Sequence, residues 1–491
     1  MKDSDSVPPL TPAQALSGLE RILGPQGILT AETPGTSPAS AADLEPYLTD
    51  HRRRYHGRAL AVVLPRVVTE VTEVLAFCNQ HGIGAVPQGG NTGYCGGATP
   101  DDSGRQIVVS LSRLNRVRHV DALNYSIVAE AGCVLAQVQR AADEAQRFFP
   151  LSLGSEGTCQ VGGNLATNAG GVHVLRYGMM RDLVLGLEVA LADGRLLSSL
   201  GTLRKDNTGY DVKSLFLGAE GTLGIITAAS LKLFPKLRAF AAAFAAVADP
   251  RAAVALLARL RDASGDRVSS FELIPRIAVE LTSRHIPGVR DPLDAPHPWY
   301  VLCELTSSRA DDPLADLLEQ CLADAMEEKL VLDAAVARGE SDRAAFWKLR
   351  ETIPEAQRRD GASLKHDISV PVASIPDFIE QGSRWLTGHV PEGRLVAYGH
   401  VGDGNLHFNM NQAPGADRAA FLARDEPVKR AMHDLVRDFG GSFSAEHGIG
   451  RLKVGELERY APPVELDLMR AIKRTLDPNG ILNPGKVLRD T

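Results

Sequence analysis

The sequence predicts an α+β fold built from more than one domain. The chain has 491 residues, which is more than a single hydrophobic core normally organises. Before Lys236, short strand-like runs and helical patterns surround three glycine-rich segments. After Lys236, strand and helix patterns alternate, which predicts a second α+β domain with an antiparallel sheet.

Composition is that of an ordinary soluble enzyme, with 44% hydrophobic residues, 23% charged residues and a net charge of −7. That negative charge argues against nucleic acid, which normally selects a basic surface. No apolar run approaches the length of a membrane span. The N-terminal stretch lacks the pattern of a secretion signal or a transit peptide, and the six cysteines form no CxxC pair. We therefore expect a cytoplasmic protein.

The first part of the chain contains two helical patterns before its strands begin. One covers Pro12–Leu23, and the other covers Val67–His81, where apolar residues recur at helical spacing until Gly82 stops them. The predicted elements that follow are strands at Ile107–Leu111, Val117–Val120 and Ser126–Ala129, a helix at Leu135–Gln146, a hairpin of Leu183–Ala192 with Arg195–Ser199, and a strand at Ile225–Phe234.

The second part begins after Lys236 and alternates strands with helices. The predicted elements are strands at Ala239–Val247, Ser269–Leu273 and Trp299–Thr306, with helices at Pro250–Asp262 and Asp312–Glu328. After about residue 425 the chain turns helical. It ends in Leu476–Lys486, LDPNGILNPGK, whose two turn dipeptides predict an extended tail.

Three glycine-rich segments carry the first chemical signal. They are Leu153–Gly178, Val86–Gly97 and Leu217–Ile226, in which asparagine and threonine interleave with glycine. Glycine lets the backbone approach a ligand closely, and successive N–H groups can surround a phosphate. A long flexible surface loop is the alternative for any one segment. Three such segments suggest a long ligand that carries a pyrophosphate. No GxGxxG follows the first strand and no GxxxxGK[ST] occurs, which argues against a Rossmann or P-loop site for that ligand.

The segment Gly399–Asn409, GHVGDGNLHFN, predicts a metal site. If Asp403-Gly404 forms a two-residue hairpin turn, His400 stands directly opposite His407, and both imidazoles share one face of the sheet. Glu446 offers a third ligand. Two histidines and a carboxylate fit a catalytic zinc, and iron and manganese fit as well. The alternative is a structural polar pair.

Two cations upstream of this segment are candidates for binding a carboxylate. Arg350 lies on a helical pattern, and Lys365 opens a predicted strand, Lys365–Val370. An arginine can hold a carboxylate through two hydrogen bonds. Solvated surface charges are the alternative for both residues.

These segments together resemble the FAD-dependent 2-hydroxy-acid dehydrogenases of the vanillyl-alcohol-oxidase type, in particular the D-2-hydroxyglutarate and D-lactate dehydrogenases. The resemblance extends from about Tyr47 to Leu488. The motifs that carry it are PQGGNTG (87–93), GGNLATNAGG (162–171), RYG (176–178), GAEGTLGIIT (218–227), GHVGDGNLHFN (399–409), EHGIG (446–450) and LDPNGILNPGK (476–486).

The resemblance implies a two-subdomain FAD-binding domain at 1–236, an α+β cap domain on an antiparallel sheet at 237–430, and a C-terminal helical segment at 431–491 that returns to the flavin. In members of the family that bind FAD covalently, the attached histidine lies in the first glycine loop. Here that loop contains no histidine, so FAD is expected without a covalent link. The residues expected to bind it are Pro87, Gly89, Gly90, Asn91, Thr92, Gly93, Leu153, Gly154, Gly157, Gly162, Gly163, Asn164, Thr167, Asn168, Gly170, Gly178, Glu220, Gly221, Gly224, Ile225 and Asn483.

The resemblance also implies the roles of the polar residues. His400, His407 and Glu446 match the metal ligands, and His447 matches the residue beside the substrate, where it would act as the general base. The residues expected to bind the substrate are Arg350, Lys365, Asn409 and His447. The implied reaction is oxidation of a D-2-hydroxy acid to its 2-oxo acid, with electrons passed to an electron-transfer flavoprotein or a quinone.

One position departs from the family pattern. Where the hydroxyglutarate enzymes carry a hydroxyl residue about one helical turn after the arginine, this chain has Pro354. That favours D-lactate or another D-2-hydroxy acid over D-2-hydroxyglutarate. Two other functions stay open, namely an oxygen-using flavin oxidase of another alcohol or lactone and a non-catalytic flavin-binding electron-transfer subunit. A homodimer also stays open.

Overall fold

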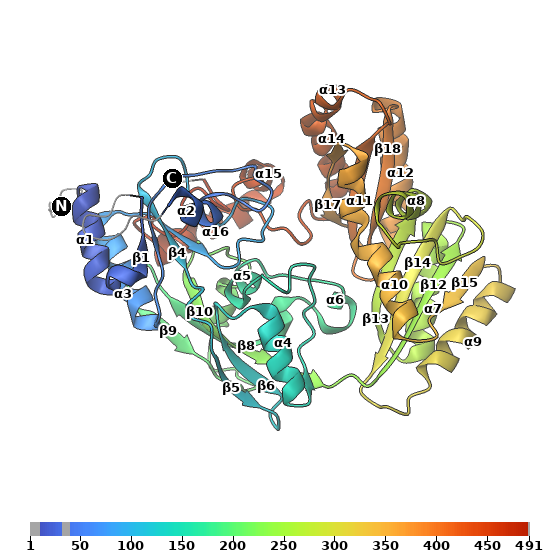
Figure 1. The fold of residues 1–491 in the computed structure, drawn as a ribbon, viewed down its shortest axis with the longest axis horizontal. Helices are drawn as coiled ribbons and strands as arrows, with labels where there is room; N and C mark the ends of the chain where they lie inside the picture. Colours follow the sequence, from blue (N-terminus) through green and yellow to red (C-terminus); the bar gives the residue numbers. More distant parts are fainter. Residues whose placement is uncertain (1–9, 32–39, 490–491) are drawn as a thin grey trace. The chain divides into compact units, whose positions relative to one another are not determined.

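The structure is a computed structural model that describes residues 10–31 and 40–489 (Figure 1). It consists of two compact units. The first comprises Met1–Ala169, Met179–Pro235 and His447–Thr491, and the second comprises Gly170–Gly178 and Lys236–Glu446. The chain changes unit after Pro235, close to the predicted boundary. The expected third segment, 431–491, is divided between the two units at Glu446.

The first sheet of the first unit has the strand order β1-β2-β4-β3. Its three longer strands run parallel, whereas β1 pairs antiparallel with β2. Their bounds are β1 Ile28–Leu29, β2 Ala59–Val63, β3 Ala85–Gln88 and β4 Gln106–Ser110, with helices α1 Pro12–Leu23, α2 Ala41–Leu48 and α3 Val68–His81. Buried side chains of α1, α3 and these strands form one hydrophobic core. Because β3 ends at Gln88, the loop Gly89–Gly93 follows directly from the carboxyl end of this strand.

The second sheet of the first unit is antiparallel, with the order β5-β6-β10-β8-β9. Its strands are β5 Val117–Asp121, β6 Ser126–Glu130, β8 Val184–Ala190, β9 Leu196–Ser199 and β10 Ile225–Lys232, accompanied by α4 Leu135–Glu144, α5 Val161–Ala166 and the short pair β7 Arg147–Phe148 and β11 Phe234–Pro235. The predicted strands and hairpin are confirmed within one or two residues. The helix α4 ends before Gln146 because that residue takes a positive φ of 57°.

The C-terminal part of the first unit contains α15 Val454–Tyr460, α16 Pro463–Leu476 and an extended tail. In the tail, the N–H of Asn483 donates to the carbonyl of Ala85 and the N–H of Ala85 donates to the carbonyl of Ile481, both at 2.7–2.8 Å. The tail thereby extends the first sheet beside β3. The prediction of an extended rather than helical tail is confirmed.

The second unit is built on one antiparallel sheet with the order β15-β12-β14-β13-β18-β19-β16, and β17 also pairs with β19. Its strands are β12 Ala239–Val247, β13 Val268–Pro275, β14 Trp299–Ser307, β15 Asp333–Val336, β16 Ser363–Leu364, β17 Asp367–Ser369, β18 Gly393–His400 and β19 Asn405–Gln412. The predicted antiparallel sheet is confirmed. The strand predicted at Lys365–Val370 is shorter than expected and begins at Asp367.

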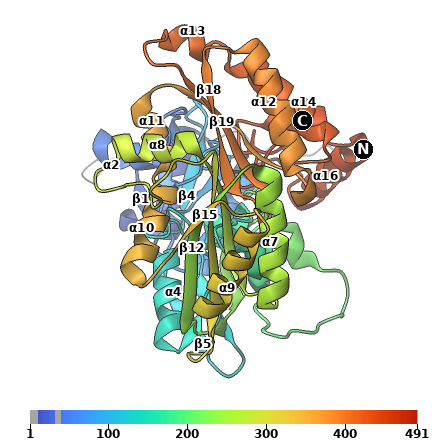
Figure 2. The same cartoon turned by 90° about the vertical axis from the view of Figure 1, so that its right-hand side faces the viewer.

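Helices cover both faces of this sheet (Figure 2). On one face lie α7 Pro250–Ser264, α9 Leu314–Glu327, α12 Ile375–His389 and α14 Asp425–Asp438, and on the other lie α8 Arg276–His285, α10 Glu340–Glu351 and α11 Ile353–Asp360; the short helices α6 Val174–Tyr177 and α13 Arg418–Leu422 complete the unit. Alternate side chains of each strand point to opposite faces, so Ala243 packs in the first layer and Phe244 in the second. No described helix is long and apolar enough to cross a bilayer.

Candidate active site

The glycine segments of the first unit line a single cleft with a cavity volume of about 150 Å³. The walls come from the loop after β3, from α5 and from the segment that leads into β10. The predicted cofactor residues in these walls are Pro87, Gly89, Gly90, Asn91, Thr92, Gly93, Gly162, Gly163, Asn164, Thr167, Glu220, Gly221, Gly224 and Ile225. Segments far apart in the sequence thus line one cavity. Independent flexible surface loops, the alternative for these segments, would not need to lie together.

The cleft fits a ligand that is held by main chain. A Cβ on Gly90 would lie 2.2 Å from the carbonyl oxygen of Thr158, so only glycine lets these two loops pack. A Cβ on Gly163 would meet nothing within 4 Å, so no side chain narrows the cavity there. In the same wall, the buried Oε1 of Gln160 has no hydrogen-bond partner among the described residues. These features suit the phosphates and the polar ring edge of FAD.

Several predicted cofactor residues do not line this cleft. They are Leu153, Gly154, Gly157, Asn168, Gly170, Gly178 and Asn483. Two of them hold neighbouring loops: the Asn168 carboxamide oxygen accepts from the N–H of Arg181, and the Asn483 amide donates to the carbonyls of Gly97 and Glu220. Gly170 and Gly178 belong to the second unit. A glycine or asparagine in a motif can therefore serve chain packing as well as ligand contact.

Other residues line the cleft without having been predicted to bind the cofactor. They include Gln88, Tyr94, Cys95, Cys159, Gln160 and His447. All except His447 lie within the glycine-rich segments Val86–Gly97 and Leu153–Gly178, and that position is the signal that points to them. His447 had been assigned to the substrate, and its ring packs edge-on against Tyr94, with ring centroids 4.8 Å apart at 78°.

Glu220 joins the cleft to the turn after His447. Its carboxylate accepts hydrogen bonds from the N–H groups of Ile449, at 2.7 Å, and Gly450, at 2.8 Å. Burial raises the pKa of this carboxyl to about 7, although the two N–H donors favour its charged form. Glu220 also takes a positive φ of 50°. The side chain predicted to contact the cofactor therefore also holds the backbone that follows the proposed base.

The predicted metal ligands come together within the second unit. Donor atoms of His400, His407 and Glu446 all lie within 4.8 Å of one another. The Nε2 atom of His400 is 3.7 Å from Oε1 of Glu446, and Nε2 of His407 is 4.0 Å from Oε2. With bonds of about 2.0–2.2 Å, two ligands of one zinc ion can be up to about 4.3 Å apart. Both histidine–Glu446 distances lie within this limit, so these three side chains could hold one ion.

The pairing expected for the two histidines is wrong by two residues. Tyr398, not His400, stands opposite His407 in the β18–β19 pair. The connection between these strands is longer than the two-residue turn proposed at Asp403-Gly404, because β18 ends at His400 and β19 begins at Asn405. A shift of two residues preserves the face of a strand, so His400 and His407 remain neighbours, with ring centroids 5.9 Å apart.

Asp367 holds Glu446 in place and was not identified from the sequence. It pairs with His407 across β17 and β19. Its Oδ2 accepts a hydrogen bond from the N–H of Glu446 at 3.0 Å, and its Oδ1 accepts from the Asn405 amide at 3.0 Å. Asp367 is 6% exposed, so its carboxyl group is buried beside the cluster. Only the tertiary pairing of β17 with β19 reveals this role.

Arg350 is buried, contrary to the alternative of a solvated surface charge. It is 6% exposed, its Nε donates to Glu272 at 2.7 Å, and its guanidinium lies over the Tyr398 ring at 4.9 Å. Its Nη2 is buried and makes no hydrogen bond among the described residues. A buried guanidinium nitrogen without a partner is costly, and an anionic ligand would satisfy it.

The two other predicted substrate residues lie near β19. Lys365 is half-buried between β16 and β17. Asn409 is buried, and its amide accepts from the N–H of His366 and donates to the side chain of Gln357 in α11, both at 3.1 Å. In this structure, the Asn409 amide therefore anchors α11 to the sheet.

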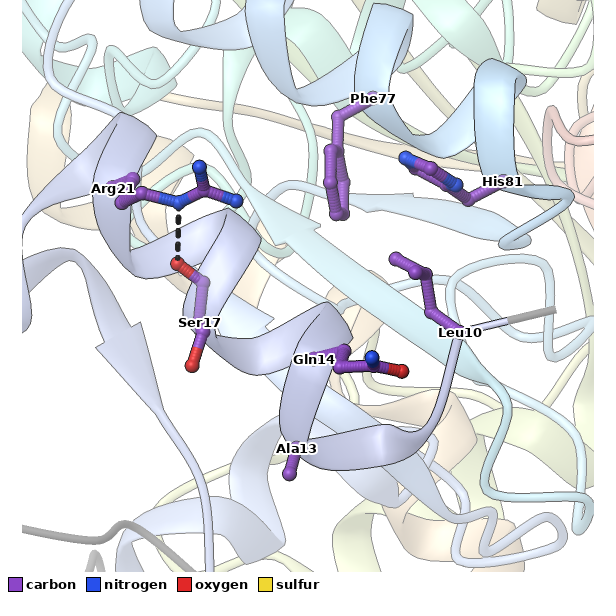
Figure 3. Close-up of a pocket in the computed structure, with 7 residues that line it drawn as sticks. All are labelled: Leu10, Ala13, Gln14, Ser17, Arg21, Phe77 and His81. Atoms are coloured by element: carbon purple, nitrogen blue, oxygen red, sulfur yellow. Dashed lines mark hydrogen bonds between the residues drawn. The ribbon is translucent and has the colours of Figure 1, made fainter. Parts of the chain in front are cut away.

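A second hollow of the first unit lies between α1 and α3 (Figure 3). It is lined by Leu10, Ala13, Gln14, Ser17, Arg21, Phe77 and His81. The Nε of Arg21 donates to the Ser17 carbonyl, and the rings of Phe77 and His81 are in contact. No described carboxylate lines this hollow, and none of the glycine motifs reaches it. The cleft around α5 is therefore the better cofactor site.

Comparison with protein families agrees with this assignment. Residues 236–487 match the C-terminal domain of FAD-linked oxidases, and residues 59–199 match an FAD binding domain. The FAD part of the predicted cofactor set is thus confirmed.

Named relatives cover nearly the whole chain. The D-2-hydroxyglutarate dehydrogenase of Arabidopsis thaliana is 38% identical over 446 residues, which is 91% of this chain and 78% of that protein. The enzyme of that name from Xanthomonas citri pv. viticola is 36% identical over 469 residues, 95% of this chain and 96% of that protein. The chain therefore belongs to the FAD-linked hydroxy-acid dehydrogenase family that contains the D-2-hydroxyglutarate dehydrogenases.

Solved structures show the same fold at low sequence identity. A p-cresol methylhydroxylase structure aligns with a TM-score of 0.75 at 19% identity, covering 97% of each chain. The 4-ethylphenol oxidase of Gulosibacter chungangensis aligns with a TM-score of 0.69 at 18% identity, covering 97% of this chain and 96% of that one. These likenesses concern the fold alone, and they confirm the predicted fold class.

The expectation of a cytoplasmic location is wrong by this comparison. The relatives from Arabidopsis thaliana, Danio rerio and Bos taurus are named as mitochondrial enzymes. All six cysteines are free and buried. Free thiols report a reducing environment only, and they do not distinguish the cytoplasm from another reducing compartment.

Proposed function

We propose that this protein oxidises a D-2-hydroxy acid to its 2-oxo acid with FAD and a divalent metal ion, and that zinc is the first metal to test. The observation that carries this proposal is the cluster of His400, His407 and Glu446 in the same unit as Arg350. The cluster offers nitrogen and oxygen donors to one ion. The buried Nη2 of Arg350 offers a hydrogen-bond donor to a carboxylate.

D-2-hydroxyglutarate and D-lactate are the two substrates to compare. The relatives named for D-2-hydroxyglutarate favour the five-carbon diacid. Pro354 removes a hydroxyl that would help to bind its distal carboxylate. A shorter monocarboxylate does not need that contact, so D-lactate remains a candidate.

Each residue has one role in the proposed reaction. His447 takes the proton of the substrate hydroxyl as general base. Arg350 and Lys365 bind carboxylate oxygens, and Asn409 supports this region by holding α11. His400, His407 and Glu446 would hold a divalent ion, which would supply Lewis acidity toward the hydroxyl oxygen. The glycine-lined cleft would hold FAD, which would supply two-electron redox chemistry for the hydride on C2.

The electrons leave the protein through an acceptor other than NAD. The sequence has no GxGxxG after its first strand, which is the usual fingerprint of a dinucleotide site in a Rossmann fold. An electron-transfer flavoprotein or a quinone suits a flavin enzyme of this kind.

The test is a dye-reduction screen over D- and L-2-hydroxy acids, run on chelated protein and on the same protein after metal is added back. We expect turnover with D-enantiomers only, lost on chelation and restored by a divalent ion. Full activity after chelation would refute the metal. Hydrogen peroxide formed in step with substrate, without dye, would instead identify an oxygen-using oxidase.

A further inference from the structure

Glu272 lies at the centre of the polar cluster in the second unit. It belongs to β13, is fully buried at 0% exposure, and faces α10 and α11. One carboxylate oxygen, Oε2, accepts from Nε of Arg350 at 2.7 Å. The other, Oε1, contacts Nδ1 of His400 at 2.5 Å. One side chain therefore touches both a proposed substrate ligand and a proposed metal ligand.

The contact with His400 is built into the sheet. Glu272 and His400 are cross-strand partners of β13 and β18, so both side chains emerge on the same face. A carboxylate paired with a guanidinium is ionised and can only accept hydrogen bonds. The proton of the His400 ring is therefore on Nδ1, which leaves Nε2 as the atom that can bind an ion.

The contact with Arg350 determines how that guanidinium is presented. Because Nε is engaged by Glu272 and the plane of the group lies over Tyr398, the group cannot rotate freely. The atom left without a partner is Nη2. Glu272 therefore orients the fork that would receive a carboxylate.

We propose that Glu272 is a positioning residue that sets both the metal-binding tautomer of His400 and the orientation of Arg350. The inference rests on the proposed function. Metal-binding histidines commonly donate their second ring N–H to a carboxylate, and losing such a partner typically weakens metal binding by about 10–100-fold. Here the same carboxylate would also control the binding of the substrate.

Glu304 provides a matched control in the same sheet. It lies on β14, is also 0% exposed, and contacts α10. Its carboxylate accepts from Nε of Arg343 at 2.5 Å and from Nε1 of Trp347 at 3.0 Å. Like Glu272 it is buried and paired with an arginine, but among the described residues it makes no hydrogen bond with a histidine.

The experiment compares Glu272→Gln with Glu304→Gln in the full-length protein, loaded with FAD and stripped of metal. Zinc affinity is measured by competition with a chelator, and KM is measured after metal is restored. We expect Glu272→Gln to bind zinc about 10–100-fold more weakly and to show a raised KM. Glu304→Gln should bind zinc like the wild type, although both variants lose a buried ion pair.

Glu272→Asp covers the case in which Glu272→Gln does not fold. Aspartate keeps the charge but is one methylene shorter, so it cannot reach both partners, and we expect zinc affinity below that of the wild type. Wild-type zinc affinity in a folded Glu272 variant, or equal losses in Glu272→Gln and Glu304→Gln, would overturn the inference. A wild-type protein that binds no zinc or other divalent ion would instead refute the proposed function.

Discussion

Tyr398 lies directly opposite His407 in the β18–β19 pair, and the two ring centroids are 4.9 Å apart. The guanidinium of Arg350 lies over the same tyrosine ring, 4.9 Å from its centroid. Tyr398 is 2% exposed, so this buried ring contacts both a proposed metal ligand and the proposed carboxylate ligand. The positions of His407 and Arg350 are thus linked through their packing against Tyr398.

The first prediction concerns the metal. His400→Ala and His407→Ala should each abolish turnover, because losing one of three ligands removes most of the affinity of an open site. The visible flavin spectrum should persist, since the glycine-lined cleft is formed by other segments. Metal content per protein and the flavin absorbance check both statements. Turnover at the wild-type rate in either variant would make the histidines a structural pair.

The second prediction concerns how the flavin is held. We expect acid or heat to release intact FAD into the supernatant, because the loop Gly89–Gly93 contains no histidine. Instead, the main chain at Gly90 and Gly163 can approach the flavin closely, because neither residue has a side chain. Absorbance of the supernatant and of the washed precipitate measures the two fractions. Yellow colour that stays with the precipitate would demonstrate a covalent bond.

The third prediction concerns His447. His447→Asn keeps approximate size but cannot take the substrate proton, so flavin reduction should slow by about 10²–10⁴-fold. Stopped-flow absorbance gives this rate, and metal analysis of the same sample supplies the control. Metal content should remain normal. If metal and activity fall together, His447 is a ligand and the role of Glu446 needs to be reassigned.

The fourth prediction concerns Glu220 and pH. Its pKa rises from 4.5 to about 7 on folding because it is buried. Between these values the folded protein retains a proton that the unfolded chain releases, so raising the pH destabilises the fold. At about 1.4 kcal/mol per pKa unit, the ionisation of Glu220 lowers the free energy of unfolding by about 3 kcal/mol. This decrease is complete above pH 7. Below pH 4.5 Glu220 is protonated in both the folded and the unfolded chain, so it does not lower the free energy of unfolding.

Glu220→Gln tests this statement because glutamine cannot ionise. The difference in free energy of unfolding between variant and wild type, from urea titrations of FAD-loaded protein, should shift by about 3 kcal/mol in favour of glutamine as the pH rises from 4.5 to above 7. A difference that does not change with pH would show that the two N–H donors fully offset the burial.

Local sequence patterns predicted much of the fold. The helix Pro12–Leu23 appears with the predicted bounds because Thr11 caps it and proline occupies its first turn. The alternation of strand and helix patterns after Lys236 predicted the antiparallel sheet of the second unit. The same patterns could not show that Gly170–Gly178 joins the second unit, because that depends on contacts such as Arg176 with Thr306.

The candidate site was predictable where a motif contains its own geometry. His400 and His407 lie on one hairpin, and an error of two residues in register left them on the same face. Glu272 and Asp367 were not predictable, because each meets its partner only through pairing with a distant strand. A buried glutamate within an apolar strand, as in VSSFELIP of β13, is the one signal that could have indicated Glu272.

The last prediction concerns Pro354 and the size of the substrate. Pro354 is an exposed residue in the first turn of α11, after the helix that carries Arg350. The hydroxyl of nearby Thr352 already donates to the carbonyl of Lys348 at 2.7 Å, so that donor is engaged. A hydroxyl at position 354 would add a hydrogen bond to a distal carboxylate. Such a bond is worth roughly 1.5–3 kcal/mol, or about ten- to a hundredfold in kcat/KM.

Pro354→Thr should therefore raise kcat/KM for D-2-hydroxyglutarate by about ten- to a hundredfold and leave that for D-lactate unchanged. Pro354→Val is the matched control, because valine has the shape of threonine without its hydroxyl, and it should raise neither value. In the wild type we expect D-2-hydroxyglutarate to be no more than a modest substrate beside D-lactate. A wild-type preference for D-2-hydroxyglutarate of about tenfold or more, unchanged in Pro354→Thr, would show that another residue supplies the donor and that Pro354 does not set the preference.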